Sequence, residues 1–523
     1  MMKKILVPGV LILTLFACSH QGTVPAHGGA TRLDSSQLKP MHPMKDWAFN
    51  PKVRILSDAM TARIRPVGQA VLTAEAEGEE PCREILTNSL AEDGARPGMQ
   101  NEVSVAVSGD RIVVTYNDDN HRPDSVSGFT GSQDGGMTFT DGGGFIPAEG
   151  RFGGGDPLIL ADPNDPDRFV YIQLTYSGYS DSSILLHESL DGGKTFPPDQ
   201  SRDILKGVKS PIKGKPMTSP AFFHDKEWAA WDGPSDTLAL AWGLGTYTAS
   251  YPVVITSNDG GRTWSDGVNL ATENQMGGLT AVAAGTAGEL YVAWIEYYSS
   301  TLRLSRSMDG GRTWEGPFLA ADTFQAPFDD QATTSCGRTA LNGEIRTATV
   351  PSLAVDPDTG ALYLVYNYKQ DKDSDDDSDI GFVRSTDRGE TWSAPVRLND
   401  DATLNDQFMP WVAAAGEGSL LAIFYDRRDD PKNEDMHVYA AQSLDGGETW
   451  LANRRLTCRS FPVAQDSCYM GDYNQVVTDG KFYYAAWGDN RDTVTVEGLD
   501  EPNPNVYLTR IGVRPRTRPV TPP

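Results

Sequence analysis

Short apolar runs alternate with polar, glycine-rich turns along most of the chain, and the runs return at a regular spacing. Seven of them read as buried β-strands: Ile112–Tyr116, Phe169–Thr175, Leu238–Trp242, Leu290–Trp294, Leu362–Tyr366, Leu420–Tyr425 and Phe482–Trp487. Another strand is expected to start before each run, near Val103, Pro157, Trp228, Leu279, Ser352, Trp411 and Tyr473. Repeats of about 40–70 residues with three or four strands indicate a propeller. The pattern predicts an all-β β-propeller of four-stranded blades, with seven blades.

An eight-residue motif closes each of the first six units. It reads Ser-x-Asp-x-Gly-x-Thr followed by Trp or Phe, and its copies start at Ser132, Ser189, Ser257, Ser307, Ser385 and Ser443. The Asp can accept backbone N–H groups of a turn, and the Gly can adopt the positive φ that the turn needs. The final aromatic residue can fill the space between sheets. We therefore expect these regular aspartates to be structural and not catalytic.

This octet resembles the Asp-box, or BNR repeat, of the sialidase-like β-propellers. The resemblance implies the propeller fold over roughly residues 100–513 and places the octets on the face opposite the active site. Sialidases of this kind have six blades, which keeps six as the alternative to seven. The seventh unit, Gly471–Val513, has three strands and no octet. We expect the segment around residues 53–75 to supply its outer strand and close the ring.

The N-terminus has the pattern of an export signal. Lys3 and Lys4 precede the apolar stretch Ile5–Phe16, which is short for a membrane span. Leu15-Phe16-Ala17-Cys18 resembles a bacterial lipobox, which implies a lipid on Cys18, and the following Ser19 resembles an outer-membrane address. The alternative is an ordinary signal peptide cleaved near Ala17.

These features predict four segments. They are a signal peptide (1–17), a lipidated N-terminus with a flexible tether (18–50), the propeller (51–513) and a disordered tail (514–523). The predicted location is the bacterial outer membrane or cell surface, with a periplasmic or secreted protein as the alternative. The protein would touch the membrane only through its lipid, and we expect a monomer.

The chain has five cysteines. If Cys18 carries lipid, four remain for disulfides in an oxidising compartment. Four cysteines allow three pairings, and Cys458 lies near Cys468 in one loop-like stretch. We predict Cys458–Cys468 with Cys82–Cys336; four free buried thiols are the alternative.

The charge balance limits the partners. With 45 basic and 71 acidic residues, the formal net charge is −26. Such a chain repels phosphate backbones and anionic membrane surfaces, so nucleic-acid binding is not expected. Arginines interleave with acids in the loops after the second strands, as in Asp426-Arg427-Arg428 and Asn490-Arg491. Such a rim suits a polar ligand, including a sugar acid. The alternative is a set of structural Arg–Asp pairs that brace neighbouring loops.

The resemblance implies a set of site residues. A sialidase uses a Tyr nucleophile, a Glu that activates it, an Asp general acid and three Arg residues that bind the substrate carboxylate. Tyr473 matches the nucleophile, Glu227 the activator, and Asp118, Asp156 or Asp225 the acid. Arg427, Arg428 and Arg491 match the carboxylate clamp, and Asp472 lies beside Tyr473 as a further substrate-binding candidate.

No cofactor is expected, with one open point. Asp371, Asp373 and Asp375 belong to a dense acidic run whose oxygens could bind Ca²⁺. The run lacks the Gly and terminal Glu of an EF-hand loop, and a solvated charge run is the alternative. The seven His residues form no zinc-binding pattern.

The sequence thus predicts an exported, lipid-anchored, sialidase-like glycoside hydrolase that acts on extracellular or surface glycans. An exo-α-sialidase-like activity with Tyr473 at its centre is the enzymatic form of this hypothesis. The alternative is a non-catalytic β-propeller that binds glycan or protein at the cell surface, because one fold supports both uses.

Overall fold

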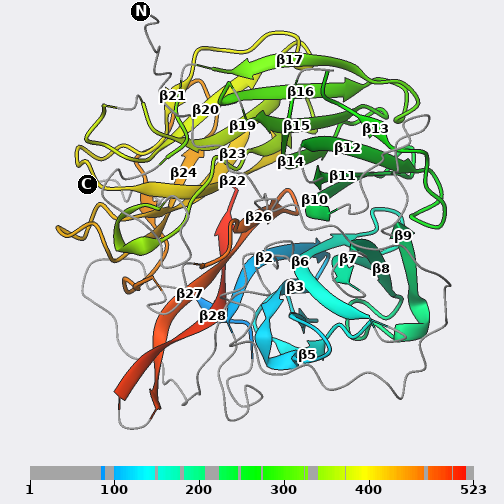
Figure 1. Ribbon diagram of the computed structural model, residues 1–523, viewed down its shortest axis with the longest axis horizontal. Coiled ribbons are helices and arrows are strands. Elements are labelled where there is room, and N and C mark those ends of the chain that lie inside the picture. The colour runs from blue at the N-terminus through cyan, green and yellow to red at the C-terminus, as the bar shows by residue number, and fades with distance from the viewer. Residues whose placement is uncertain are drawn as a thin grey trace, which may run out of the picture.

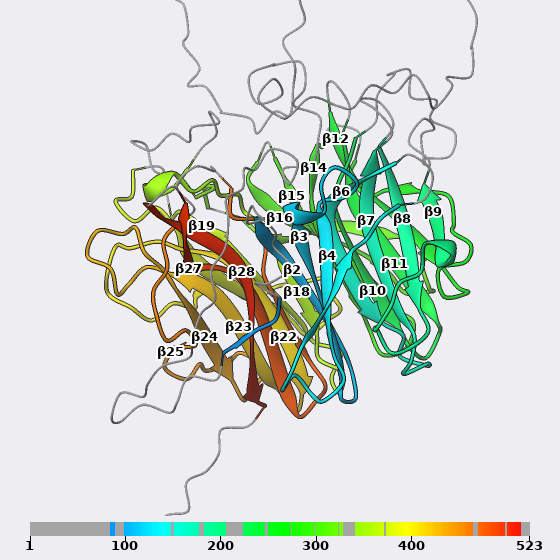
Figure 2. The ribbon, with the colours of Figure 1, turned by 90° about the horizontal axis from the view of Figure 1, so that it is seen from below.

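Seven four-stranded antiparallel sheets surround a common axis in the computed structural model (Figure 1). The structure describes residues 84–88, 99–147, 151–176, 182–205, 223–245, 249–272, 275–297, 299–322, 324–327, 340–370, 373–463, 469–496 and 499–513. Figure 2 shows the blades edge-on. The predicted all-β propeller with seven blades is confirmed.

The blades follow one another along the chain, each running from an inner to an outer strand. Blade 1 consists of β2 (Gln100–Ser108), β3 (Arg111–Asp118), β4 (Ser127–Ser132) and β5 (Thr140–Gly144). Blade 2 consists of β6 (Phe152–Ala161), β7 (Phe169–Tyr176), β8 (Ser182–Ser189) and β9 (Ser201–Leu205). Blade 3 consists of β10 (Phe223–Asp232), β11 (Thr237–Gly245), β12 (Ser250–Ser257) and β13 (Val268–Asn269). Blades 4 and 5 are β14 (Gly277–Ala284), β15 (Leu290–Glu296), β16 (Thr301–Ser307), β17 (Glu315–Ala321); and β18 (Ser352–Val355), β19 (Leu362–Tyr368), β20 (Asp379–Ser385), β21 (Val396–Arg397). Blade 6 is β22 (Gln407–Gly416), β23 (Ser419–Asp426), β24 (His437–Ser443), β25 (Arg454–Arg455). Short 3₁₀ turns are η4 (Asp119–His121), η5 (Pro198–Gln200) and η6 (Asn342–Glu344).

The seventh blade joins the two ends of the described chain. Its strands are β26 (Gln475–Thr478), β27 (Phe482–Val496), β28 (Leu499–Gly512) and, outermost, β1 (Ile85–Leu86), which pairs with β28. An N-terminal segment therefore closes the ring, as expected, but the outer strand is Ile85–Leu86 and not the segment 53–75. That segment lies outside the described residues.

The octets form hydrogen-bonded turns after the third strand of each of the first six blades. In the third copy, Asp259 accepts hydrogen bonds from the backbone N–H of Thr263 (2.8 Å), the Thr263 hydroxyl and the Ser257 hydroxyl (2.7 Å). The same bonds recur at Asp134, Asp191, Asp309, Asp387 and Asp445. Because neighbouring strands are antiparallel, these turns lie at the opposite end of the blade from the starts of the inner strands and the loops after the second strands.

The inner strands share a bulge close to their first residues. A residue with positive φ marks it in five blades: Glu102 (53°), Asp156 (54°), Lys226 (54°), Leu279 (50°) and Met409 (52°). The strand register shifts at each of these positions. Left-handed backbone is costly for residues other than glycine, and such bulges re-aim side chains next to functional sites.

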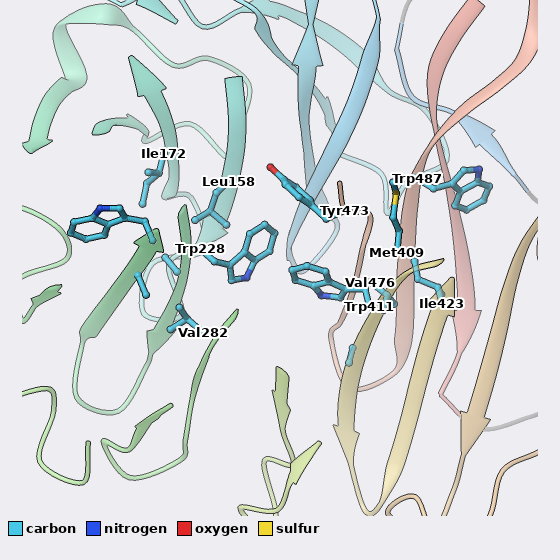
Figure 3. Packing of buried hydrophobic residues seen from close by; sticks show 14 of the residues in the cluster. Leu158, Ile172, Trp228, Val282, Met409, Trp411, Ile423, Tyr473, Val476 and Trp487 are labelled. Atoms are coloured by element: carbon cyan, nitrogen blue, oxygen red, sulfur yellow. The ribbon is translucent and has the colours of Figure 1, made fainter. Parts of the chain in front are cut away.

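Aromatic side chains fill the middle of the ring. Trp228 of blade 3 contacts Trp411 of blade 6 with ring centroids 4.4 Å apart, and Tyr473 packs edge-on against Trp228 at 5.4 Å. Figure 3 shows the three rings side by side, between Leu158 and Met409. Inner strands from opposite sides of the ring thus meet in one apolar plug.

The predicted signal peptide, the tether with Cys18 and the tail 514–523 all lie outside the described residues and remain predictions. In the part of the chain that the structure covers, no helix has the length and apolar character to cross a membrane.

Candidate functional site

Three charged residues occupy the bulge position in three consecutive blades and converge above the aromatic plug. Glu102 and Asp156 are fully buried, and Lys226 is 8 % exposed. The Lys226 ammonium lies 2.5 Å from Glu102 Oε1, 2.8 Å from Asp472 Oδ2 and 3.7 Å from Asp156 Oδ2. One side chain therefore links blades 1, 2, 3 and the start of blade 7. We call Glu102, Asp156, Lys226, Asp472 and Arg346 the axial cluster.

Arg346, which precedes β18, is the second cation of this cluster. Its guanidinium donates two hydrogen bonds to Asp472, from Nε (3.1 Å) and Nη2 (2.5 Å), and its Cζ lies 4.2 Å from the centre of the Tyr469 ring. Two parallel N–H···O bonds fix the carboxylate in one orientation. Asp472 thus holds both cations of the cluster.

Asn117, at the end of β3, orients the two buried acids. Its Nδ2 donates to Glu102 Oε2 (2.9 Å), and its Oδ1 accepts the backbone N–H of Asp156 (3.0 Å). The backbone N–H of Asp472 donates to Glu102 Oε1 (3.1 Å). The bulges of blades 1 and 2 are therefore held in register by a single amide side chain.

The cluster shifts the protonation of its members. Burial alone would lower the pKa of Lys226, but Asp156, Asp472 and Glu102 outweigh it and raise that pKa well above its usual range. Lys226 is therefore charged at neutral pH. Burial raises the pKa of Glu102 well above normal, with Asp156 and Asp472 adding to the rise and Lys226 opposing it.

Tyr473 lies between this cluster and the plug. It is 6 % exposed, and the Lys226 ammonium lies 5.6 Å from the centre of its ring. Burial, followed by the charges of Glu102 and Asp156, raises the pKa of its phenol well above normal, and Lys226 opposes this rise. The phenol is therefore neutral, so it would need a proton acceptor to act as a nucleophile.

Glu227 follows Lys226 in the bulge of β10 and is 1 % exposed. Neither of its carboxylate oxygens has a hydrogen-bond partner on another residue that the structure describes, and the backbone N–H of Glu227 itself stabilises the carboxylate. Burial, with Asp156 and Asp225 adding to it, raises the pKa of Glu227 well above its usual range, although the hydrogen bond from its own backbone N–H and the charge of Lys226 oppose the rise. Burial of this kind favours the protonated form of the carboxyl group.

The other acid candidates occupy different surroundings. Asp225 precedes Lys226 in β10 and is half-buried. Asp118 lies at the end of β3, where its Oδ1 accepts the backbone N–H of Asn120 (3.0 Å) and its Oδ2 is 3.2 Å from His121 Nε2. Asp118 thus caps η4, whereas Asp156 belongs to the axial cluster.

The three predicted clamp arginines form separate ion pairs. Arg427 is fully buried and pairs with Asp406 (3.0 Å), and Arg428 pairs with Asp426 and Asp400 (2.6 Å). Arg491 pairs with Asp489 and Glu84. Within the described part of the chain, none of the three guanidinium groups contacts Tyr473. The structure brings together Tyr473, Asp472, Asp156 and Glu227, and it places these arginines elsewhere.

The acidic run and the cysteines are only partly described. Asp371 lies outside the described residues, whereas Asp373 and Asp375 lie between β19 and β20. Where the structure describes the chain, no three His, Cys, Asp or Glu residues gather as metal ligands. Cys458 is disulfide-bonded, but Cys468, Cys82 and Cys336 lie outside the described residues, so the predicted pairings remain predictions.

Glu102, Arg346 and Asn117 were not among the predicted site residues. Glu102 could have been found from the repeat, because it stands near the start of its inner strand, at the same bulge position as Asp156 and Lys226. Arg346 lies in an irregular segment before blade 5, and nothing in the sequence pattern links that segment to Asp472.

No protein-family model matches the chain, and no curated protein matches it. Among solved structures, the chain is similar to the Hadza microbial sialidase Hz136, with 14 % identity and a TM-score of 0.40 over 79 % of this chain and 66 % of that one. It is similar to an ulvan lyase of polysaccharide lyase family PL25, with 12 % identity and a TM-score of 0.46 over 80 % and 94 %. It is also similar to the α-L-arabinanase of Penicillium chrysogenum, with 11 % identity and a TM-score of 0.39 over 79 % and 94 %. Likeness at this level assigns no function to the chain.

Proposed function

We propose that this propeller is a glycoside hydrolase whose site lies at the axial cluster, with Tyr473 and Glu227 as the reacting groups. The observation that carries the proposal is the buried Glu227, whose oxygens have no partner on another described residue, in the same bulge as Lys226 and close enough for its charge to act on Tyr473. A carboxyl group in such surroundings suits general acid catalysis at neutral pH.

Each group has a role in the proposed reaction. The Tyr473 oxygen attacks the anomeric carbon as the bond to the leaving sugar breaks, and the leaving oxygen takes the proton of Glu227. The raised pKa of Glu227 favours this donor role over the activating role predicted from the sequence. The phenol proton passes to an ionised carboxylate of the cluster, for which Asp156 is the candidate, because its charge acts on Tyr473 whereas the raised pKa of Glu102 favours its protonated form. Water then hydrolyses the glycosyl–tyrosine bond.

A panel of glycoside substrates tests whether the protein hydrolyses glycans or only binds them. Purified protein is tested against fluorogenic α- and β-glycosides that include sialosides, uronides, neutral sugars and amino sugars. Tyr473→Phe is expected to lower kcat on the responsive substrate by at least about a hundredfold, since it removes the nucleophile. Tyr484→Phe is the matched control, because its hydroxyl bonds Asp479 in the β26–β27 turn at the opposite end of the blade. Full turnover by Tyr473→Phe would exclude the tyrosine mechanism.

The pairing of the cluster cations favours a second candidate, a non-catalytic propeller that binds glycan. Lys226 and Arg346 both contact carboxylates, as a structural network would require. If no glycoside is turned over but a glycan array shows saturable binding that Tyr473→Ala weakens, this candidate replaces the first.

Export and lipid anchoring remain part of the proposal on the strength of the lipobox-like sequence alone. The mature protein, purified from the membrane fraction of a bacterial host, is expected to carry the added acyl mass on Cys18. A mature mass without acyl chains, or a Cys18→Ala variant that remains in the membrane fraction, would contradict lipidation.

A further inference from the structure

The axial cluster has more acidic groups than cations. Among the described residues, its acids together with the adjacent Glu227 number four, Glu102, Asp156, Asp472 and Glu227, against the two cations Lys226 and Arg346. These acids are between 0 and 9 % exposed. Buried charge without a counter-charge is costly, so the excess acids favour their protonated forms, and a ligand that brings positive charge can take the place of these protons.

Both cations are already engaged. Lys226 touches Glu102 and Asp472 within 2.8 Å, and Arg346 forms two bonds to Asp472 while it stacks on Tyr469. An anionic sugar would have to displace one of these carboxylates before it could bind either cation. The net charge of −26 also slows the approach of a polyanion.

Glu227 supplies the acceptor for such a ligand. Its two oxygens find no donor on another described residue, although the side chain is 1 % exposed. Lys226, Tyr473 and Asp472, with 8, 6 and 9 % of their surface exposed, connect the cluster to solvent. A ligand group that enters there and donates N–H bonds would satisfy both oxygens.

We infer that the site takes a glycan that carries free amino groups, such as a polymer of unacetylated hexosamine, in preference to an acidic or N-acetylated one. The inference rests on the proposed function, because it names the substrate class of that site. An ammonium group would be held by a charge-assisted hydrogen bond to Glu227 beside Asp156.

Binding of an ammonium group is linked to a proton. Asp156 of β6, Asp225 and Lys226 of β10, and the phenols of Tyr171 and Tyr473 lie in the electrostatic surroundings of Glu227. Because the pKa of Glu227 is raised well above normal, the protonated carboxyl is favoured in the free protein. A bound ammonium favours the ionised form, so we expect Glu227 to release about one proton to the buffer on binding.

The experiment is isothermal titration calorimetry on Tyr473→Phe, which binds without turnover, in two buffers of different ionisation heat at about pH 6. The probes are glucosamine hexamer, N-acetylglucosamine hexamer and galacturonic acid hexamer. We expect the first to bind at least about tenfold more tightly than the other two, with proton release and with weakening by salt. Glu227→Gln, introduced into the same background, should abolish the release, and Glu390→Gln on an exposed octet turn should not.

The outcomes separate the inference from the proposed function. Tighter binding of the acetylated or the acidic hexamer, or binding of the glucosamine hexamer without proton release, overturns the inference and leaves hydrolysis standing. Absence of binding and of turnover for every glycan in both panels overturns the two together. Circular dichroism of Glu227→Gln checks that the variant is folded.

Discussion

At the scale of single residues, the centre of the molecule depends on one lysine in a costly backbone conformation. Lys226 has a φ of 54°, and its ammonium meets carboxylates from three other parts of the ring. When one partner of a buried ion pair is removed, the other charge stays buried without compensation. The stability lost in this way is larger than the stability lost when the whole pair is replaced by apolar residues. The residue is therefore expected to contribute strongly to stability whatever its role in catalysis.

Lys226→Met should lower the free energy of unfolding by about 3–5 kcal/mol, because Glu102 would remain buried without its cation and Asp472 would keep only Arg346. Urea unfolding followed by tryptophan fluorescence measures the loss. The matched control is Arg384→Met. Arg384 pairs with Glu448, whose side chain is 62 % exposed, so the loss of this ion pair should cost at most about 1 kcal/mol. Equal losses in the two variants would show that the axial cluster contributes no more than a surface pair.

Glu227→Gln tests the proton donor in turnover. A neutral amide cannot supply a proton, so kcat should fall by about a hundred- to ten-thousandfold on substrates with poor leaving groups and much less on activated aryl glycosides. The basic limb of the pH–rate profile should disappear with the carboxyl group. If both substrate types slow equally and the profile keeps its shape, Glu227 is a positioning residue and not the acid.

At the scale of elements, the octet turns show how a short sequence makes the same structure six times. Each Asp accepts backbone and hydroxyl donors from the next turn residues, and these bonds stabilise its ionised form. The pKa of Asp134, Asp259, Asp309 and Asp387 is lowered to about 2. Their turns lie at the opposite end of the blades from the axial cluster, so the most regular acids of the chain are structural.

The octets predict the acid side of the stability profile. A carboxyl group whose folded pKa lies below its usual value stabilises the fold above that usual value and loses this contribution as the pH falls toward about 2. Asp259→Asn should lower the melting temperature at neutral pH, since its hydrogen bonds contribute about 1–2 kcal/mol. It should also flatten the fall in melting temperature between about pH 4 and pH 2. Glu390→Gln is the control; an equally steep fall in Asp259→Asn would contradict the assignment.

At the scale of the whole molecule, the ring is closed by two residues of β1. Ile85 and Leu86 pair with Leu508 and Tyr507, and the next two residues, Thr87 and Asn88, hold the backbone of Val506. Asn88 also donates to Asn505 (2.8 Å), and both asparagines are buried. A short strand with side-chain hydrogen bonds thus covers the edge that blade 7 would otherwise expose.

Asn88→Ala should lower the free energy of unfolding by about 2–4 kcal/mol, because the Val506 N–H and the side-chain Oδ1 of Asn505 lose their buried partner. Hydrogen exchange at Val506 should accelerate, and proteases should cleave near residues 84–88 before the rest of the ring. Asn164→Ala, which removes an exposed hydrogen bond to Gly233, is the control and should change little. Unchanged hydrogen exchange at Val506 would show that β1 stays paired with β28 without the hydrogen bonds of Asn88.

Local patterns were enough to predict the strands. All seven predicted second strands lie inside observed ones, because a buried strand must be apolar over its own length and end at turn residues. The number of blades follows from counting these units. The outer strand of blade 7 was assigned to the wrong residues, because two residues at a sheet edge leave no periodic signal.

Site residues could be predicted from the sequence only where they lie next to a recognisable strand. Tyr473, Asp156 and Glu227 stand at inner-strand starts, so topology alone places them on one face. The axial cluster needed the tertiary structure, since Lys226, Asp472 and Arg346 meet across the ring from segments more than a hundred residues apart. The sequence determines the blades, because strand formation and the octet turns depend on neighbours in the chain. Only the closed ring decides which charges meet, because contacts across its axis depend on bulge geometry and blade number.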